Sequence, residues 1–145
     1  MKFPTRRAFA AVLPSLGLAQ QTSQKTPRGE ILPTGAFVFE KLRLRQSQNM
    51  KTYPILSGTT HSGFNLDLHE TELAPGGVPH PPHQHVHEEL LFVREGELEV
   101  IQSGGTTRLG PGSCAYMASN DLHGYRNTGT TPAKYFVLAL GTDAT

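Results

Sequence analysis

The sequence has one cysteine, no basic cluster in its body and no apolar run long enough to cross a bilayer. A single cysteine, Cys114, cannot form an intramolecular disulfide, so the fold must be stable without one. Its apolar surroundings predict a small buried side chain. At 145 residues, the chain is long enough for one domain and too short for two domains of ordinary size. The sequence therefore predicts one domain with an ordinary hydrophobic core.

Other absences exclude classes of function. The formal net charge is +1 with histidine neutral, and basic residues are spread over the body, so we expect no nucleic-acid partner. No G-x-S-x-G pattern surrounds Ser113, and no basic residue neighbours Cys114 in sequence, so nucleophilic catalysis has no support. A phosphate-binding glycine loop is also absent from the sequence. The chemistry must come from other side chains.

Residues 1–19 have the three-part organisation of a secretory signal peptide. A basic start is followed by the apolar stretch 8–19 and by the polar residues 20–25. The apolar stretch is shorter than the roughly 20 residues of a membrane-spanning helix, and Pro14 weakens any helix in it. We therefore expect a cleavable signal peptide ending near Ala19 and no stable membrane anchor.

Residues 5–9, which include Arg6 and Arg7, resemble the twin-arginine export motif. The resemblance implies export of the folded protein to the periplasm or the exterior by that route. The usual Leu-Lys ending of the motif is absent, which leaves ordinary secretion as the alternative. In either case the mature protein is expected to be secreted. The remaining alternative is that these residues form a disordered or helical tail of a cytosolic protein.

The rest of the chain is expected to be all-β. Residues 20–34 are rich in Gln, Thr, Pro and Gly and predict a linker or N-terminal arm. From residue 35 to residue 145, short apolar or alternating runs recur between Gly, Pro and Asn residues, without a sustained helical period. This pattern predicts a sandwich or barrel, because a parallel sheet would need helices between its strands.

Alternation predicts the positions of the strands. In residues 64–68, Phe64, Leu66 and Leu68 are predicted to be buried, and the polar residues between and after them to face water. Gly96 is expected to take a positive φ in a short hairpin connection. The later strands are expected at residues 90–94, 98–102, 106–109, 113–117, 122–126 and 133–140.

Four of the seven histidines fall between His80 and His87, and a pair of glutamates follows. Neutral imidazoles and carboxylates are good ligands for Mn, Fe, Co, Ni, Cu and Zn. Residues two apart on a strand point to the same side, so His83 and His85 could bind one ion from one strand. His85 and His87 share this spacing and remain an alternative pair.

Two segments of the chain resemble the two motifs of the cupin family. The first, residues 77–96, is Gly77-x5-His83-x-His85-x3-Glu89-x6-Gly96. The second, residues 112–127, is Gly112-x5-Ala118-x-Asn120-x2-His123-x3-Asn127, with Ala118 in place of the usual Pro and Asn120 in place of the usual Gly. Both departures fall in a turn, and Asn tolerates the left-handed conformation. The resemblance covers roughly residues 60–140.

The resemblance implies a single-domain cupin jelly-roll β-barrel over residues 35–145. It also implies one divalent transition metal (Mn, Fe, Ni, Co, Cu or Zn) with the ligands His83, His85, Glu89 and His123. Two coordination positions would stay open for water, dioxygen or a bidentate ligand. Glu89 could also accept a proton, which makes it the candidate catalytic residue. Many cupins are dimers built through their outer strands, so a homodimer is expected.

The same resemblance leaves the reaction open. The first hypothesis is a metal-dependent enzyme acting on a small oxygen-rich chelating substrate, as a dioxygenase, decarboxylase or isomerase. The alternative is a non-catalytic cupin module that binds a small molecule or a metal. Cupins with this ligand set include all of these, so fold alone does not choose between them.

The remaining histidines are expected at less central positions. A motif shifted by two residues would have Leu91 where the glutamate belongs, so His80, His87 and Glu88 are expected at the rim of the site. Pro79, Pro81 and Pro82 are expected to hold His80 extended, away from His83. His61 and His69 lie outside both motifs and are expected on the surface or on an edge strand.

Overall fold

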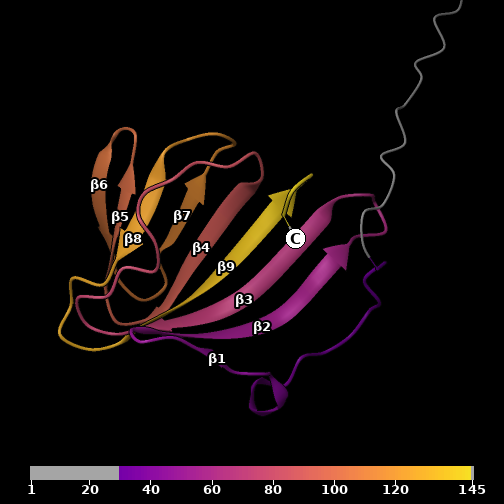
Figure 1. Cartoon of the computed structure of the whole chain (residues 1–145), viewed down its shortest axis with the longest axis horizontal. Helices are drawn as coiled ribbons and strands as arrows, with labels where there is room; N and C mark the ends of the chain where they lie inside the picture. The colour runs from indigo at the N-terminus through magenta and orange to yellow at the C-terminus, as the bar shows by residue number, and fades with distance from the viewer. Residues whose placement is uncertain (1–29, 145) are drawn as a thin grey trace, which may run out of the picture.

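This computed structural model describes residues 30–144. They contain nine strands and one short 3-10 helix, joined by turns and loops (Figure 1). In chain order they are η1 (Phe39–Lys41), β1 (Arg45–Gln46), β2 (Met50–Thr59), β3 (Asn65–Leu73), β4 (Glu88–Glu95), β5 (Leu98–Gln102), β6 (Gly105–Leu109), β7 (Cys114–Met117), β8 (His123–Arg126) and β9 (Ala133–Gly141). Among these residues, no helix is long and apolar enough to cross a membrane. The predicted signal peptide, residues 1–19, lies outside the described residues, so export stays a prediction.

The strands form two sheets. One has six strands in the order β1-β2-β3-β9-β4-β7, and the other has three in the order β6-β5-β8. Figure 1 shows the small sheet on one side and the long strands β2, β3, β9 and β4 on the other. Neighbouring named strands pair antiparallel throughout. The predicted all-β jelly-roll barrel is confirmed.

The hydrophobic core fills the space between the sheets. Leu73, Leu91 and Met117 from the large sheet and Leu98 from the small sheet are each 0% exposed. Burying a side chain of this size stabilises the fold by about 1.5 to 3 kcal/mol. The core residues are Leu73, Leu91, Val93, Leu98, Val100, Leu109, Ala115, Met117, Tyr125, Ala133, Tyr135 and Val137.

The six strands predicted after residue 88 all exist, with ends within two residues of the predicted ones. The strands β1 and β2 have no counterpart in the prediction. Lys51, Thr52 and Pro54 interrupt the apolar pattern of β2, and its register against β3 shifts between Pro54 and Leu56. Residues 30–32 also join this strand, since Leu32 N–H donates to Thr59 O at 2.9 Å. Part of the expected N-terminal arm thus lies against the barrel.

The two faces of β3 are opposite to the prediction. Thr71 and Leu73 are buried, whereas Phe64 is 47% exposed. Leu66 pairs with Leu140, and Leu68 with Leu138, on the outer face of the large sheet. Asp67 and His69 share the inner face with Thr71, because alternate residues of a strand point the same way. The inner face is polar because it lines a cavity, described below, rather than the core.

Cys114 is exposed, so its predicted burial is wrong. Its strand, β7, alternates between exposed and buried residues, and the inward positions are taken by Ala115 and Met117. Cys114 pairs with Phe92 of β4, which is itself 44% exposed on the outer face.

The expected homodimer stays a prediction, because the structure contains a single chain.

Two turns have the backbone conformations that the sequence predicts. Gly96 has φ 75° between β4 and β5, and Asn120 has φ 60° in the turn before β8. A Cβ atom on Gly96 would lie 2.6 Å from Pro132 O and 2.7 Å from Ala133 Cα. Only glycine fits there without a backbone shift.

We predict that Gly96→Ala lowers the free energy of unfolding by at least about 2 kcal/mol, because it combines a left-handed residue with a backbone clash. Gly104→Ala is the matched control, since nothing lies within 4 Å of a Cβ at Gly104. It should change stability by less than about 0.5 kcal/mol. Urea unfolding of the three proteins measures the difference, and equal midpoints would contradict this account of the turn.

Candidate metal centre

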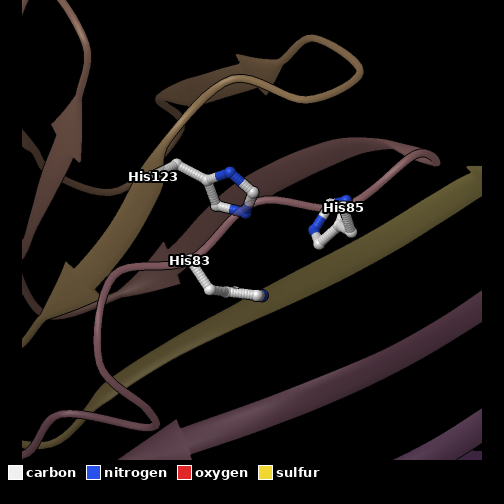
Figure 2. A group of neighbouring side chains, drawn as sticks. All are labelled: His83, His85 and His123. Atoms are coloured by element: carbon white, nitrogen blue, oxygen red, sulfur yellow. The ribbon is translucent and has the colours of Figure 1, made fainter.

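The predicted ligands come from three places in the barrel. Glu89 lies on β4 and His123 at the start of β8, whereas His83 and His85 lie in the segment between β3 and β4. Figure 2 shows the rings of His83, His85 and His123 turned toward one another. The prediction that His83 and His85 share a strand is wrong: residues 81–87 contain only an isolated bridge between His83 and His123. Prolines beside this segment lack the N–H groups that a strand inside a sheet needs.

Backbone contacts hold this irregular segment in place. His83 and His123 exchange two backbone hydrogen bonds, each 2.9 Å from N to O. The Asn120 N–H donates to His85 O at 2.7 Å. A Cβ on Gly141 would lie 2.8 Å from the Cα of His87, so β9 approaches the segment closely. The chain therefore fixes the histidines without a regular strand.

The three rings lie close together. Ring centroids are 5.1 Å apart for His83 and His85, 4.9 Å for His83 and His123, and 4.7 Å for His85 and His123. One nitrogen from each ring lies within 4.8 Å of the others. Two imidazole nitrogens on opposite sides of one ion are about 4.2 Å apart, because each metal–nitrogen bond is about 2.1 Å long. Small side-chain rotations would bring all three onto one ion.

Neighbouring carbonyl groups fix the tautomers of two of these histidines. The Nδ1 of His85 lies 2.8 Å from His87 O, and the Nδ1 of His123 lies 2.8 Å from Asp121 O. A carbonyl oxygen only accepts hydrogen bonds, so each Nδ1 carries the proton and donates. Each Nε2 therefore keeps its lone pair, as a metal ligand requires.

Three predicted ligands each have a buried polar atom without a hydrogen-bond partner among residues 30–144. These atoms are His83 Nδ1, Glu89 Oε1 and His123 Nε2. A buried polar atom left without a partner costs about 1 to 3 kcal/mol. A divalent cation held by the histidine group would satisfy its unpaired nitrogens, and Glu89 adjoins that group through His85, so the donors present fit the metal that the sequence predicts.

Glu89 is the acidic member of the site and is 7% exposed. Its Oε2 lies 3.5 Å from His85 Nε2. Burial raises the pKa of Glu89, and the neighbouring His85 and His69 oppose that rise. Glu89 also forms a second possible group with His85 and His87. The four predicted ligands are thus distributed over two overlapping groups that share His85.

Burial favours the neutral imidazole at three histidines of the site, which are His83, His87 and His123. The pKa of His83 is lowered from its ordinary value of 6.5 to about 4, by burial first and then by the surrounding histidines. Burial also lowers the pKa values of His87 and His123. A metal ion binding here would have few protons to displace.

The neighbouring histidines take two different positions. The ring of His87 stacks on that of His85 at 3.5 Å, and its Nδ1 lies 3.2 Å from Asp143 Oδ1. His80 is exposed, but its ring centroid is only 4.2 Å from that of His83. The prediction that the prolines hold His80 away from His83 is therefore wrong. Glu88 is exposed.

A cavity of about 200 Å³ opens beside the cluster, between the large sheet and β8. Glu89 and His80 line it at the cluster. His69 also lines it, and its Nδ1 lies 3.0 Å from Asp67 Oδ1. His69 was expected on the surface or an edge strand, but β3 lies between β2 and β9. The signal that could have placed it is the alternation of Asp67, His69 and Thr71 on one face of a strand.

Comparison with known proteins identifies the fold. The family model described as "Cupin domain" matches residues 69–139. The chain contains a cupin domain. No curated protein matches it in sequence.

Solved structures have the same fold as this cupin domain. KdgF from Halomonas sp. is 20% identical, with a TM-score of 0.63 over 76% of this chain and 97% of that one. A predicted oxalate decarboxylase from Thermotoga maritima is 14% identical, with a TM-score of 0.64 over 74% of this chain and 100% of that one. The cupin domain of an XRE family transcriptional regulator from Enterobacter cloacae is 26% identical, with a TM-score of 0.52 over 63% of this chain and 96% of that one.

We predict that His83→Ala, His85→Ala or His123→Ala lowers the bound metal to less than about a tenth of an ion per chain. Each change leaves too few donor atoms to hold a divalent ion. Glu89→Gln should weaken binding less, and the exposed residue His61 provides the control His61→Ala. Elemental analysis after loading with zinc and dialysis measures the metal. The predicted ligand set is wrong if His87→Ala removes the metal while His85→Ala retains it.

We also predict that the metal-free cupin domain loses stability as pH falls from about 6.5 to about 4. Because the pKa of His83 is lower in the folded chain (about 4 against 6.5), the unfolded chain binds more protons in this interval. The stabilisation is complete above pH 6.5 and is lost as pH falls through 4. Urea midpoints of the chelator-treated protein measure the loss, and His83→Gln should lose less. An equal loss in both proteins would contradict the assignment to His83.

Proposed function

We propose that this cupin domain binds one divalent transition metal through His83, His85, Glu89 and His123, and acts as an enzyme on a small oxygen-rich chelating substrate. The observation that carries the proposal is the set of buried donor atoms without partners among the described residues, next to a cavity that Glu89 lines. Mn, Fe, Ni, Co, Cu and Zn all accept imidazole and carboxylate ligands. Such an ion, when bound, supplies a Lewis acid that polarises substrate oxygens.

The side chains of the chain would perform the remaining steps. The carbonyl groups of His87 and Asp121 hold the rings of His85 and His123 in one tautomer and orientation. Glu89 is buried beside the predicted ligand His85, and its ionised carboxylate can accept a proton. The cavity provides the space where a substrate proton could reach its carboxylate. Glu89 is therefore our candidate for proton transfer.

The alternative is a cupin module that binds its ligand without turnover. The similar cupin domain from the Enterobacter cloacae transcriptional regulator favours it, because that domain is part of a regulator. The similar predicted oxalate decarboxylase favours an enzyme. Fold similarity at these identities does not choose between them, so the choice requires a measurement of turnover.

The test uses the chain loaded separately with each of the six metals. We expect one ion per chain, and we expect the absorption spectrum of the cobalt form to change when catechol, an enediol or a keto acid is added. Product formation, or oxygen uptake with iron or manganese, would support the enzyme. A spectral change without turnover would support the binding module.

The variant His123→Ala is the control and should show neither metal nor spectral change. A cobalt spectrum typical of five or six protein donors that no chelating ligand alters would contradict open coordination positions. It would point to a structural metal instead.

A further inference from the structure

The cavity beside the metal centre contains an unused hydroxyl group. Tyr125 lies on β8, is 3% exposed and lines the cavity. Its Oη is buried without a hydrogen-bond partner among the described residues. A buried hydroxyl without a hydrogen-bond partner lowers the stability of the fold. Such a group is expected where a partner outside the protein can bond to it. The position of Tyr125 in the cavity wall indicates a ligand atom as that partner.

Tyr135 provides the contrast within the same cavity. It is 1% exposed, and a hydrogen bond joins its hydroxyl to the side chain of Thr71. The two tyrosine rings lie 6.2 Å apart between their centroids. Tyr135 is thus already satisfied inside the protein, whereas Tyr125 is available to a ligand.

Tyr125 lies close enough to the histidine cluster to contact the same ligand. Its ring centroid is 5.9 Å from that of His123 and 6.2 Å from that of His80. A cavity of about 200 Å³ has the volume of about six or seven water molecules. It therefore suits a compound of about ten non-hydrogen atoms or fewer. A molecule of that size could touch the metal ligands at one end and Tyr125 at the other.

The charges of the cavity wall restrict the ligand further. Among the described residues that line it there is no Lys or Arg, and the carboxylate present is Glu89. His69 is paired with Asp67 at 3.0 Å, so its charged form already has a counter-charge. The basic side chains Arg94 and Lys134, which do not line the cavity, bind Glu70 and Glu95. An anionic group away from the metal would be buried without a partner, which costs several kcal/mol.

Uncharged oxygens have suitable partners instead. Thr52 and Thr71 line the cavity with Tyr125, and hydroxyl groups can both donate to and accept from a ligand hydroxyl or carbonyl. We propose that the ligand of this cavity is a small neutral hydroxycarbonyl or polyol, and that Tyr125 hydrogen-bonds the oxygen that lies away from the metal. This inference rests on the proposed metal-dependent function and specifies its substrate class.

Calorimetric titration of the zinc-loaded chain tests the inference, with 1,3-dihydroxyacetone as the neutral probe and oxaloacetate as the dianionic probe. The neutral probe should bind more tightly. Tyr125→Phe should weaken its binding about five- to tenfold, the loss of one hydrogen bond, and leave oxaloacetate unchanged. Tyr116→Phe is the matched control, because Tyr116 is 51% exposed on β7. Tighter binding of oxaloacetate, or no effect of Tyr125→Phe, would overturn the proposal.

A second measurement needs neither metal nor ligand. Removing a hydroxyl that has no protein partner leaves the urea midpoint of the metal-free chain unchanged or raises it. A clearly lower midpoint for Tyr125→Phe would overturn the inference by showing that the hydroxyl is already bonded within the protein. Metal content is measured on each protein. Absence of metal from the unaltered chain rejects the proposed function, whereas a metal-loaded chain indifferent to Tyr125→Phe rejects only the role of Tyr125.

Discussion

The candidate metal centre depends on the backbone pairing of His83 with His123. Two hydrogen bonds of 2.9 Å attach the irregular segment before β4 to the start of β8. The prolines around His83 exclude a continuous strand. The short bridge therefore fixes the position of this segment, as the hydrogen bonds of a sheet would otherwise do. His85 is held by a second contact, because its carbonyl oxygen accepts a hydrogen bond from the Asn120 N–H. The rings then converge from two elements that are distant in the sequence.

Pre-organisation of the site is visible in its hydrogen bonds. The Nδ1 atoms of His85 and His123 are occupied by carbonyl groups, whereas the buried atoms that would face a cation have no partner among the described residues. Leaving polar atoms unpaired in a folded protein costs stability, and it is tolerated where binding recovers that cost. The lowered pKa of His83 and the raised pKa of Glu89 have the same origin, since burial disfavours both charged forms.

The large sheet separates two environments. Its inner face carries the polar side chains Thr71 and His69 toward the cavity, and its outer face carries Leu68 and Leu138. Period-two alternation shows which residues share a face of a strand, but not which face points inward. The usual assignment fails here because the inward residues His69 and Thr71 line a cavity instead of the hydrophobic core. Tyr125, on the opposite sheet, lines the same cavity.

The sequence alone determined the fold class, the later strands and the turns at Gly96 and Asn120, because these depend on local alternation and on backbone conformations that few residues adopt. The two motifs also indicated which side chains to expect as metal ligands. Only the tertiary structure decided the inward face of β3, the exposure of Cys114, and the closeness of His80 to His83. It also placed His69 and Tyr125 in one cavity, although neither belongs to the predicted ligand set. These features depend on which surfaces meet when the two sheets pack together, and no local pattern encodes that contact.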